Sequence, residues 1–236
     1  TTAVLDLAHA LTEHLVDPDD VRARLAAFGG VVELPPGGRG AYADVDKLVS
    51  TLAPTLPLLD LAEQYAERKR RDGLIEFSDQ VALALALLER HPEVGASLRE
   101  RYRVVLLDEY QDTNVAQTRL LAGLFAGTPV MAVGDPHQSI YGWRGASATN
   151  LDDFASRFAA AGRESVDRYS LSTSWRNGRR ILDVANALVE PLTARGGVAV
   201  GTLGPASFAS DHPVELAQLE TVEAEADHVA EWFAER

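Results

Sequence analysis

The sequence contains no cysteine, a single methionine and no long hydrophobic run. Without cysteine the chain can form neither a disulfide framework nor a thiolate metal site. No apolar stretch approaches the roughly 20 residues that a membrane-spanning helix needs, and the polar start Thr1-Thr2 is not a signal peptide. These absences predict a protein of the reducing cytoplasm with no membrane partner. The only methionine is Met131, so we expect the chain to be a segment of a longer polypeptide.

Positive charge is also scarce, because 22 Lys and Arg residues oppose 35 Asp and Glu residues, for a net charge of −13. A surface that binds nucleic acid through phosphate contacts needs clustered cations, so this balance counts against one. A narrow groove in which stacking carries the affinity remains compatible with it. The densest basic run, residues 68–71, precedes Gly73. It has two interpretations, an ordinary helix end or a contact with a DNA backbone.

The first hundred residues have helical periodicity, and the rest alternates between strands and helices. Helices are expected in 3–28 with a break at Asp17, at 42–53, 57–71 and 81–90, with a loop at 35–40. Strands are expected at 104–107, 130–133, 169–172 and 214–219, and helices at 115–125, 151–158 and 221–236. The alternation predicts an α/β fold with a parallel sheet covered on both faces. Residues 194–212 are expected to be a mobile connection.

A carboxylate pair, Asp108 and Glu109, follows the first expected strand. Open α/β sheets place their chemistry just beyond strand ends, and Mg²⁺ is commonly bound by one or two carboxylates together with phosphate oxygens and water. Asp108 is therefore the candidate metal ligand, and Glu109 is the candidate base that orients the attacking water. The alternative is an acid pair that only caps the following helix.

The second segment, residues 133–146, follows the next expected strand. Gln138 offers an uncharged donor and acceptor suited to sensing a γ-phosphate. Tyr141, Trp143 and Arg144 follow among glycines, a combination that suits stacking on unpaired bases. The alternative is that both rings are core packing.

The third segment, residues 170–177, follows the third expected strand and contains Trp175 and Arg176. An arginine placed across a cleft from a Mg²⁺-nucleotide can act as an arginine finger. The tryptophan beside it could stack on a nucleobase. The alternative is a surface ion pair beside a half-buried ring.

Together these segments resemble motifs II, III and IV of superfamily 1 DNA helicases of the UvrD, Rep and PcrA type. The stretch ending Gln-Ser-Ile-Tyr-Gly-Trp-Arg-Gly-Ala is the most specific, and residues 74–79 resemble the family's entry from its helical subdomain into the motor core. The resemblance implies a RecA-like parallel sheet of the P-loop NTPase type with a helical subdomain at the N-terminus. Residues 1–100 would be the helical part of subdomain 1B, 101–165 the second half of domain 1A, and 166–236 the start of domain 2A.

The resemblance also implies roles for individual residues. Asp108 and Glu109 would hold Mg²⁺, and Glu109 would be the catalytic base. Gln138 and Arg176 would contact the γ-phosphate of ATP. Trp175 would stack on adenine where the family usually has Tyr. Single-stranded DNA would be bound by Tyr141, Trp143 and Arg144.

Other positions of these motifs are less regular. Asp112 and Thr113 belong to the extended motif II and are expected to couple the ATP and DNA sites. The segment departs from the family's pattern at three positions of motif IV, Thr173, Ser174 and Asn177.

One element of such a motor is missing, because no Gly-x-x-x-x-Gly-Lys-Ser/Thr phosphate loop occurs in the sequence. The family's later motifs are missing too. We therefore expect the chain alone to bind ATP very weakly and not to hydrolyse it at a useful rate. Micromolar nucleotide affinity would contradict this expectation.

The function predicted from these motifs is that of a central segment of an ATP-dependent 3′–5′ DNA helicase, acting on single strands and duplex junctions in repair or recombination. Two alternatives stay open at this point. One is a nucleic-acid-binding module that has lost its motor, and the other is the motor subunit of a recombination helicase–nuclease complex. Protein partners cannot be named from the sequence.

Overall fold

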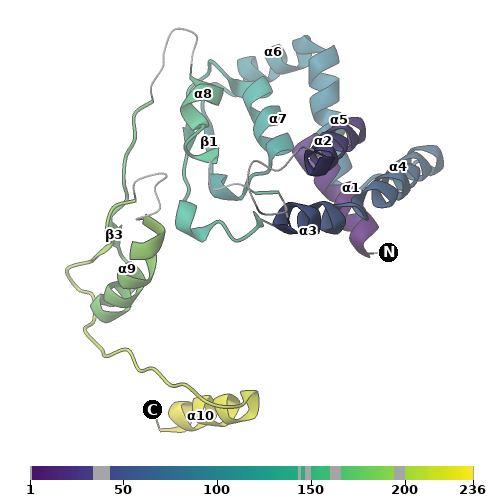
Figure 1. Cartoon of the computed structure of the whole chain (residues 1–236). Coiled ribbons are helices and arrows are strands. Elements are labelled where there is room, and N and C mark those ends of the chain that lie inside the picture. The colour runs from purple at the N-terminus through teal and green to yellow at the C-terminus, as the bar shows by residue number, and fades with distance from the viewer. Residues whose placement is uncertain are drawn as a thin grey trace. The chain divides into compact units, whose positions relative to one another are not determined.

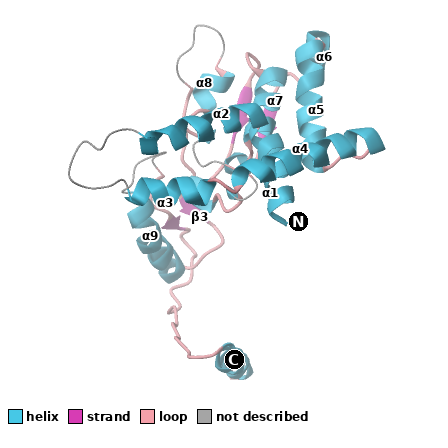
Figure 2. Cartoon of the chain, turned by 45° about the vertical axis from the view of Figure 1, so that its right-hand side comes forward, coloured by secondary structure: helices cyan, strands magenta, loops and turns pink. Residues whose placement is uncertain are grey.

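The structure is a computed structural model that describes residues 2–33, 43–142, 145–146, 150–159, 166–193 and 200–235. The chain divides into two compact units, residues 1–168 and 169–236 (Figure 1). Helices dominate, and the few strands are drawn in magenta in Figure 2. Among the described residues, no helix has the length and apolar character needed to cross a membrane.

The N-terminal part of unit 1 is helical, as predicted. Its helices are α1 (Thr2–His14), α2 (Pro18–Gly29), α3 (Ala43–Leu52), α4 (Thr55–Asp72), α5 (Phe77–Arg90) and α6 (Pro92–Arg101), with a short 3₁₀ turn at Gly30–Glu33. Asp17 caps α2 by accepting a hydrogen bond from the Asp19 amide at 2.8 Å, which explains the predicted break. The loop predicted at 35–40 lies outside the described residues.

The basic run at 68–71 is a helix end. Gly73 closes α4 in the left-handed conformation with φ 69°, and Arg68 pairs with Asp72 at 2.7 Å. Lys69 is 8% exposed, and its ammonium donates to Glu76 at 2.5 Å and to Asp79 at 2.7 Å. The structure therefore favours the helix-end interpretation, because Lys69 is turned inward.

A parallel βαβ unit follows, formed by β1 (Val105–Leu107), α7 (Val115–Phe125) and β2 (Val130–Ala132). The pairing sets Leu106 opposite Met131, and the three predicted elements are confirmed. The prediction that the sheet is covered on both faces is wrong within the described residues. Leu106 is 67% exposed and Met131 is 53% exposed. A single crossover helix covers only one face of two strands.

Tyr110 is the centre of the apolar core beside this unit. It is completely buried and meets Phe154 and Phe158 of α8 (Phe154–Phe158) edge to face, with ring centroids 5.6 and 6.1 Å apart. Helix α7 begins at a capping box in which Asn114 and Gln117 bond each other's backbone amides. Helices α5 and α6 pack against α7, the crossover helix that connects the two strands.

Unit 2 contains a second, smaller βαβ unit of β3 (Thr173–Ser174), α9 (Arg179–Thr193) and β4 (Gly204–Pro205), followed by α10 (Val222–Ala234). The side chain of Asn186 bonds both backbone groups of Leu203 and ties α9 to β4. The strand predicted at 169–172 is shifted, because β3 covers Thr173–Ser174 and pairing begins at the Ser172 carbonyl, and the strand predicted at 214–219 is absent. Tyr169 and Leu171 are more than 80% exposed, as is Leu216, so those apolar runs have no neighbouring strand to cover them. Strand β4 instead lies in the segment predicted as a connection.

The predicted α/β class is therefore present in part. The described residues carry two parallel strand pairs within a mostly helical chain, rather than a large sheet.

Candidate functional site

The carboxylate pair lies where β1 ends. Asp108 follows the strand directly, and its Oδ1 accepts a hydrogen bond from the Glu109 amide at 3.0 Å. Glu109 adopts the left-handed conformation, with φ 49° and ψ 40°, which costs a residue other than glycine about 1–2 kcal/mol. Such strain persists only where surrounding contacts hold it, and it concentrates at functional sites. The turn leaves both carboxylates exposed at the edge of the strand pair.

The segment after β2 lies beside this pair. The Val133 amide donates to the Leu107 carbonyl at 2.8 Å, and the Tyr110 amide donates to the Val133 carbonyl at 3.0 Å. The two chains thus stay hydrogen-bonded beyond the strands. Asp135 then accepts from the His137 amide at 2.9 Å and from the Gln138 side chain at 2.7 Å. Gln138 is therefore held at the same edge as Asp108 and Glu109.

Gln111 connects the two segments, although the motifs assigned it no role. It is 1% exposed. Its Nε2 donates to Glu109 Oε2 at 2.7 Å, and its Oε1 accepts from the Asp135 amide at 3.1 Å. These hydrogen bonds, here called the amide relay, link Glu109 through Gln111 to the backbone amide of Asp135, whose carboxylate in turn accepts from Gln138. The only sign of it in the sequence is an amide side chain two positions after the acid pair.

Two further buried side chains, Asn150 and Thr118, form hydrogen bonds in the segment that follows the carboxylate pair. Asn150 donates to the Thr113 carbonyl at 2.5 Å, and Thr118 donates to the Asn114 carbonyl at 2.9 Å. Thr113 thus belongs to the scaffold of the site. Asp112 has one carboxylate oxygen that is buried without a hydrogen-bond partner among the described residues. The predicted coupling role of Asp112 and Thr113 stays a prediction.

The expected DNA-contacting segment is described only in part. Tyr141 is 36% exposed, and its carbonyl accepts from the Ala146 amide at 3.2 Å. Gly145, with φ 75°, packs close to His14 of α1, where a Cβ would lie 3.1 Å from the imidazole Nε2. Trp143 and Arg144 lie outside the described residues.

Trp175 and Arg176 belong to unit 2. Trp175 is 70% exposed and lies against Phe208, with ring centroids 5.8 Å apart. The turn after β3 is closed by Ser174, whose hydroxyl accepts from the Asn177 amide at 3.3 Å. Both predicted side chains are exposed at the end of their strand.

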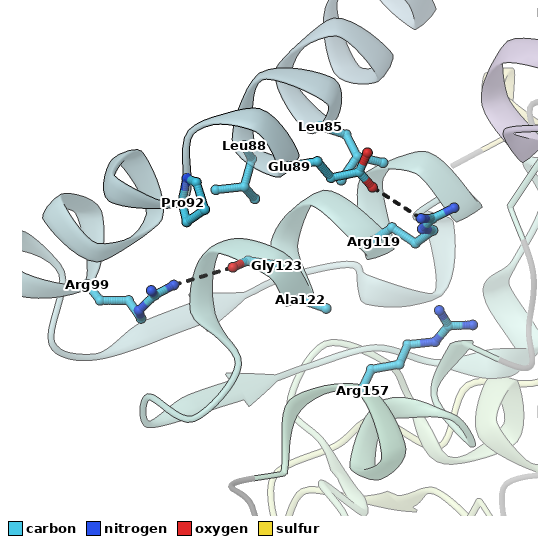
Figure 3. A pocket seen from close by; sticks show the side chains of 9 residues that line it. All are labelled: Leu85, Leu88, Glu89, Pro92, Arg99, Arg119, Ala122, Gly123 and Arg157. Carbon is cyan, nitrogen blue, oxygen red and sulfur yellow. Dashed lines mark hydrogen bonds and ion pairs between the residues drawn. The ribbon is translucent and has the colours of Figure 1, made fainter.

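A cleft of about 400 Å³ lies elsewhere in unit 1, between α5, α6, α7 and α8 (Figure 3). Its arginines have partners: Arg119 pairs with Glu89 at 3.3 Å, and Arg99 donates to the Leu124 carbonyl at 2.7 Å. None of the predicted site residues lines it. It is therefore separate from the carboxylate edge.

The carboxylate edge has the donor chemistry for a Mg²⁺-nucleotide. Two exposed carboxylates supply hard oxygens, and Mg²⁺ takes its remaining ligands from phosphates and water. Among the described residues no group of three or more His, Asp or Glu side chains could enclose a metal without such help.

Comparison with known proteins agrees with the motifs. Residues 51–159 match the UvrD/REP helicase N-terminal domain. The chain is 38% identical over 157 residues to DNA helicase II of Escherichia coli, an alignment that covers 65% of this chain and 20% of that protein. It is 34% identical over 151 residues to an ATP-dependent helicase/nuclease subunit of Streptococcus pneumoniae, covering 64% of this chain and 12% of that protein. It is also 41% identical over 87 residues to the exonuclease/helicase subunit RexA of Lactococcus lactis, covering 37% of this chain and 7% of that protein.

The match of residues 51–159 to the UvrD/REP helicase N-terminal domain, and the partial similarity to DNA helicase II, confirm the resemblance inferred from the motifs. The chain aligns with only a part of each of these larger proteins. It spans a fifth or less of the length of these curated relatives.

Proposed function

We propose that the chain is the central segment of an ATP-dependent helicase that moves 3′–5′ along single-stranded DNA and unwinds duplex junctions in repair or recombination. The observation that carries the proposal is the amide relay, because it holds a candidate base and a candidate phosphate sensor at one strand edge. The match of residues 51–159 to the UvrD/REP helicase N-terminal domain supports the same function. The cytoplasm is the expected location.

The proposed chemistry assigns one task to each side chain. Asp108 would hold Mg²⁺, which neutralises charge on the phosphates of ATP. Glu109 would accept the proton of the attacking water, and Gln138 would donate to the γ-phosphate. Arg176 would stabilise negative charge that develops on the phosphate, and Trp175 would stack on adenine. Tyr141, Trp143 and Arg144 would bind the DNA strand.

The test is ATP hydrolysis by the full-length protein with and without single-stranded DNA. Glu109→Gln should lower kcat about 10²–10⁴-fold, the range for loss of a general base, while nucleotide affinity stays unchanged. Trp143→Ala should lower the DNA-stimulated rate more than the basal rate. Equal losses would contradict the stacking role. DNA binding without any ATP hydrolysis by the wild type would favour a motor-dead binding module.

The chain itself offers a complementary measurement. It has no Walker-type phosphate loop, so a fluorescent ATP analogue should bind it very weakly, and Glu109→Gln should not change that weak signal. Micromolar affinity would show that the carboxylate edge binds nucleotide without a phosphate loop.

A helicase–nuclease motor subunit is the second candidate. The similarity to the ATP-dependent helicase/nuclease protein of Streptococcus pneumoniae favours it. The discriminating measurement is DNA degradation by the full-length protein in the presence of Mg²⁺ and ATP. Degradation that survives Glu109→Gln but requires a domain beyond residue 236 would support this candidate, whereas unwinding without degradation would support the simple helicase.

A further inference from the structure

We propose that Gln111 is a positioning residue that couples the turn carrying Gln138 to the carboxylate of Glu109. The inference rests on the proposed function, since it concerns how the same site is controlled. Gln111 itself touches neither nucleotide nor DNA in this scheme. It acts through the two groups that its side-chain amide joins.

Both the nitrogen and the oxygen of the Gln111 side-chain amide form hydrogen bonds. Its nitrogen donates to Glu109 at 2.7 Å, and its oxygen accepts from the Asp135 amide at 3.1 Å. The side chain is 1% exposed, so water cannot readily replace either bond. Because the amide is planar, its oxygen and nitrogen cannot move independently. A shift of the Asp135 backbone must therefore turn the group that orients the Glu109 carboxylate.

The close approach of the two segments is built into the backbone. A Cβ at Gly134 would lie 2.5 Å from the Gln111 Oε1 and 3.2 Å from the Gln111 backbone nitrogen. Only glycine admits this approach without displacing the amide. The far end of the same turn is also tied to Gln111, because the Ser139 hydroxyl donates to the Gln111 carbonyl at 3.3 Å.

The turn continues into Tyr141, two residues beyond Ser139. Any force on residues 139–142 is therefore applied to a turn that is bonded to Gln111 at two points. A ligand bound along that segment would change the position of Glu109 without touching it. This is a route by which single-stranded DNA would raise the rate of hydrolysis.

Two substitutions separate the two ends of the amide. Gln111→Glu keeps an oxygen for the Asp135 amide but replaces the donor facing Glu109 with a second carboxylate. Gln111→Met removes both bonds at nearly constant volume. In the full-length protein, each should lower kcat about 10²-fold or more, as expected when a general base is misplaced, with the ATP dissociation constant within threefold of wild type.

The two substitutions should differ in how fast the backbone amide of Asp135 exchanges its hydrogen. In Gln111→Met the Asp135 amide should exchange its hydrogen about five to ten times faster than in wild type, because it loses its acceptor. In Gln111→Glu that amide should keep its protection. Amide exchange is measurable on the 236-residue chain by NMR, independently of any ATPase activity.

Thr118→Val is the matched control. Thr118 is fully buried and hydrogen-bonded in the scaffold beneath the site, but it is not part of the amide relay. Thr118→Val should lower the free energy of unfolding by about as much as the Gln111 substitutions do, and it should leave kcat within threefold of wild type. A purely structural role for Gln111 predicts instead that kcat falls equally in the Gln111 and Thr118 variants.

The inference is overturned if folded Gln111→Met retains kcat within threefold of wild type, or if its Asp135 amide exchanges no faster. If neither Gln111 variant folds, Ser139→Ala tests the coupling instead, because it removes the bond between the turn and the Gln111 carbonyl. A two- to fivefold loss of DNA stimulation with unchanged basal rate supports the coupling, and unchanged stimulation overturns it. A wild-type protein without DNA-stimulated ATPase would instead refute the proposed function, and the exchange of the Asp135 amide would still test whether the relay exists.

Discussion

The two βαβ units of the chain have the same topology but very different surroundings. In β1–α7–β2, the crossover helix packs against α5 and α6, and Tyr110 and Thr118 are completely buried. In β3–α9–β4, each strand has two residues, and the only hydrophobic side chains of unit 2 buried among the described residues are Leu182 and Ala206. Parallel pairing alone therefore does not produce a buried core. The first unit has one because helices α5 and α6 pack against its crossover helix.

The same contrast extends to the predicted site residues. Glu109 and Gln138 stand at the ends of a relay of hydrogen bonds. Trp175 and Arg176 stand on a short strand with exposed side chains, and Trp175 has a partly exposed ring, Phe208, as its neighbour. Side chains that are already held in position contribute most to the stabilisation of a transition state. In the proposed function, the candidate groups of unit 1 are therefore held in place by hydrogen bonds, whereas those of unit 2 have few contacts.

The largest effect on stability is expected for Tyr110→Ala. Removing this fully buried ring, which meets Phe154 and Phe158 edge to face, should destabilise unit 1 by about 3–5 kcal/mol. Urea unfolding followed by circular dichroism measures the change. Tyr102→Ala is the control, because Tyr102 is 44% exposed and its loss should cost about 1 kcal/mol or less. Equal effects would show that the core of unit 1 lies elsewhere.

The next largest effect on stability is expected at Gly134, where the backbone approaches Gln111 closely. Gly134→Ala should destabilise the chain by about 1–3 kcal/mol, because the new methyl group collides with the Gln111 amide and backbone. Gly142→Ala, in the same segment, is the matched control, since nothing lies within 4 Å of the Cβ built there. Thermal unfolding of both variants gives the comparison. A stable Gly134→Ala with an intact Asp135–Gln111 bond would mean that the two segments are not held as closely as the structure shows.

Much of the fold was predictable because its signals are local. The cap at Asp17, the glycine at 73 and the aliphatic run at 105–107 each mark a boundary by their own chemistry. The strand predicted at 169–172, which the structure shifts to 173–174, and the absent strand at 214–219 are also apolar runs. A strand, however, needs a partner, and pairing depends on residues far away in the chain, which periodicity cannot reveal.

The sequence pointed only to the exposed ends of the amide relay. Asp108, Glu109 and Gln138 were predicted as site residues because their residue types suit phosphate chemistry at strand ends, and their roles stay predictions. Gln111 was missed because a buried amide is recognisable only by its two partners, one of which lies 24 positions away at Asp135. The exposed face at Leu106 and Met131 was missed for the same reason, since covering a sheet is a property of the whole fold.

A second polar cluster in unit 1 surrounds Glu76 and tests whether polar side-chain networks contribute to the stability of this unit. Burial alone would raise the pKa of Glu76, but hydrogen bonds from Lys69, His9 and Tyr65 outweigh it and lower the pKa to about 2. A lowered pKa in the folded state means that stability is complete above the ordinary pKa of 4.5 and is lost as the pH falls toward 2. Because Glu76 is partly exposed, the expected loss is roughly 1–2 kcal/mol.

Urea unfolding between pH 5 and pH 2.5 measures that loss, with Glu76→Gln as the reference. The variant should be less stable than wild type at pH 5 and should approach it at the acidic end. Glu93→Gln is the control, because Glu93 is 72% exposed and its removal should leave the pH dependence intact. Parallel curves for wild type and Glu76→Gln would contradict the role of the cluster.

The smallest effect is expected in unit 2. Trp175→Ala should change stability by less than about 1 kcal/mol, because the ring is 70% exposed and its neighbour Phe208 is 71% exposed. That small cost makes the substitution a clean probe of function. In the full-length protein, a tenfold or greater loss of ATP affinity with unchanged stability would mean that the indole contacts the nucleotide directly, and Trp175→Tyr, the residue usual in the family, should restore it. A stability loss above 2 kcal/mol would show instead that the ring is a packing residue, and that unit 2 is as firmly held as unit 1.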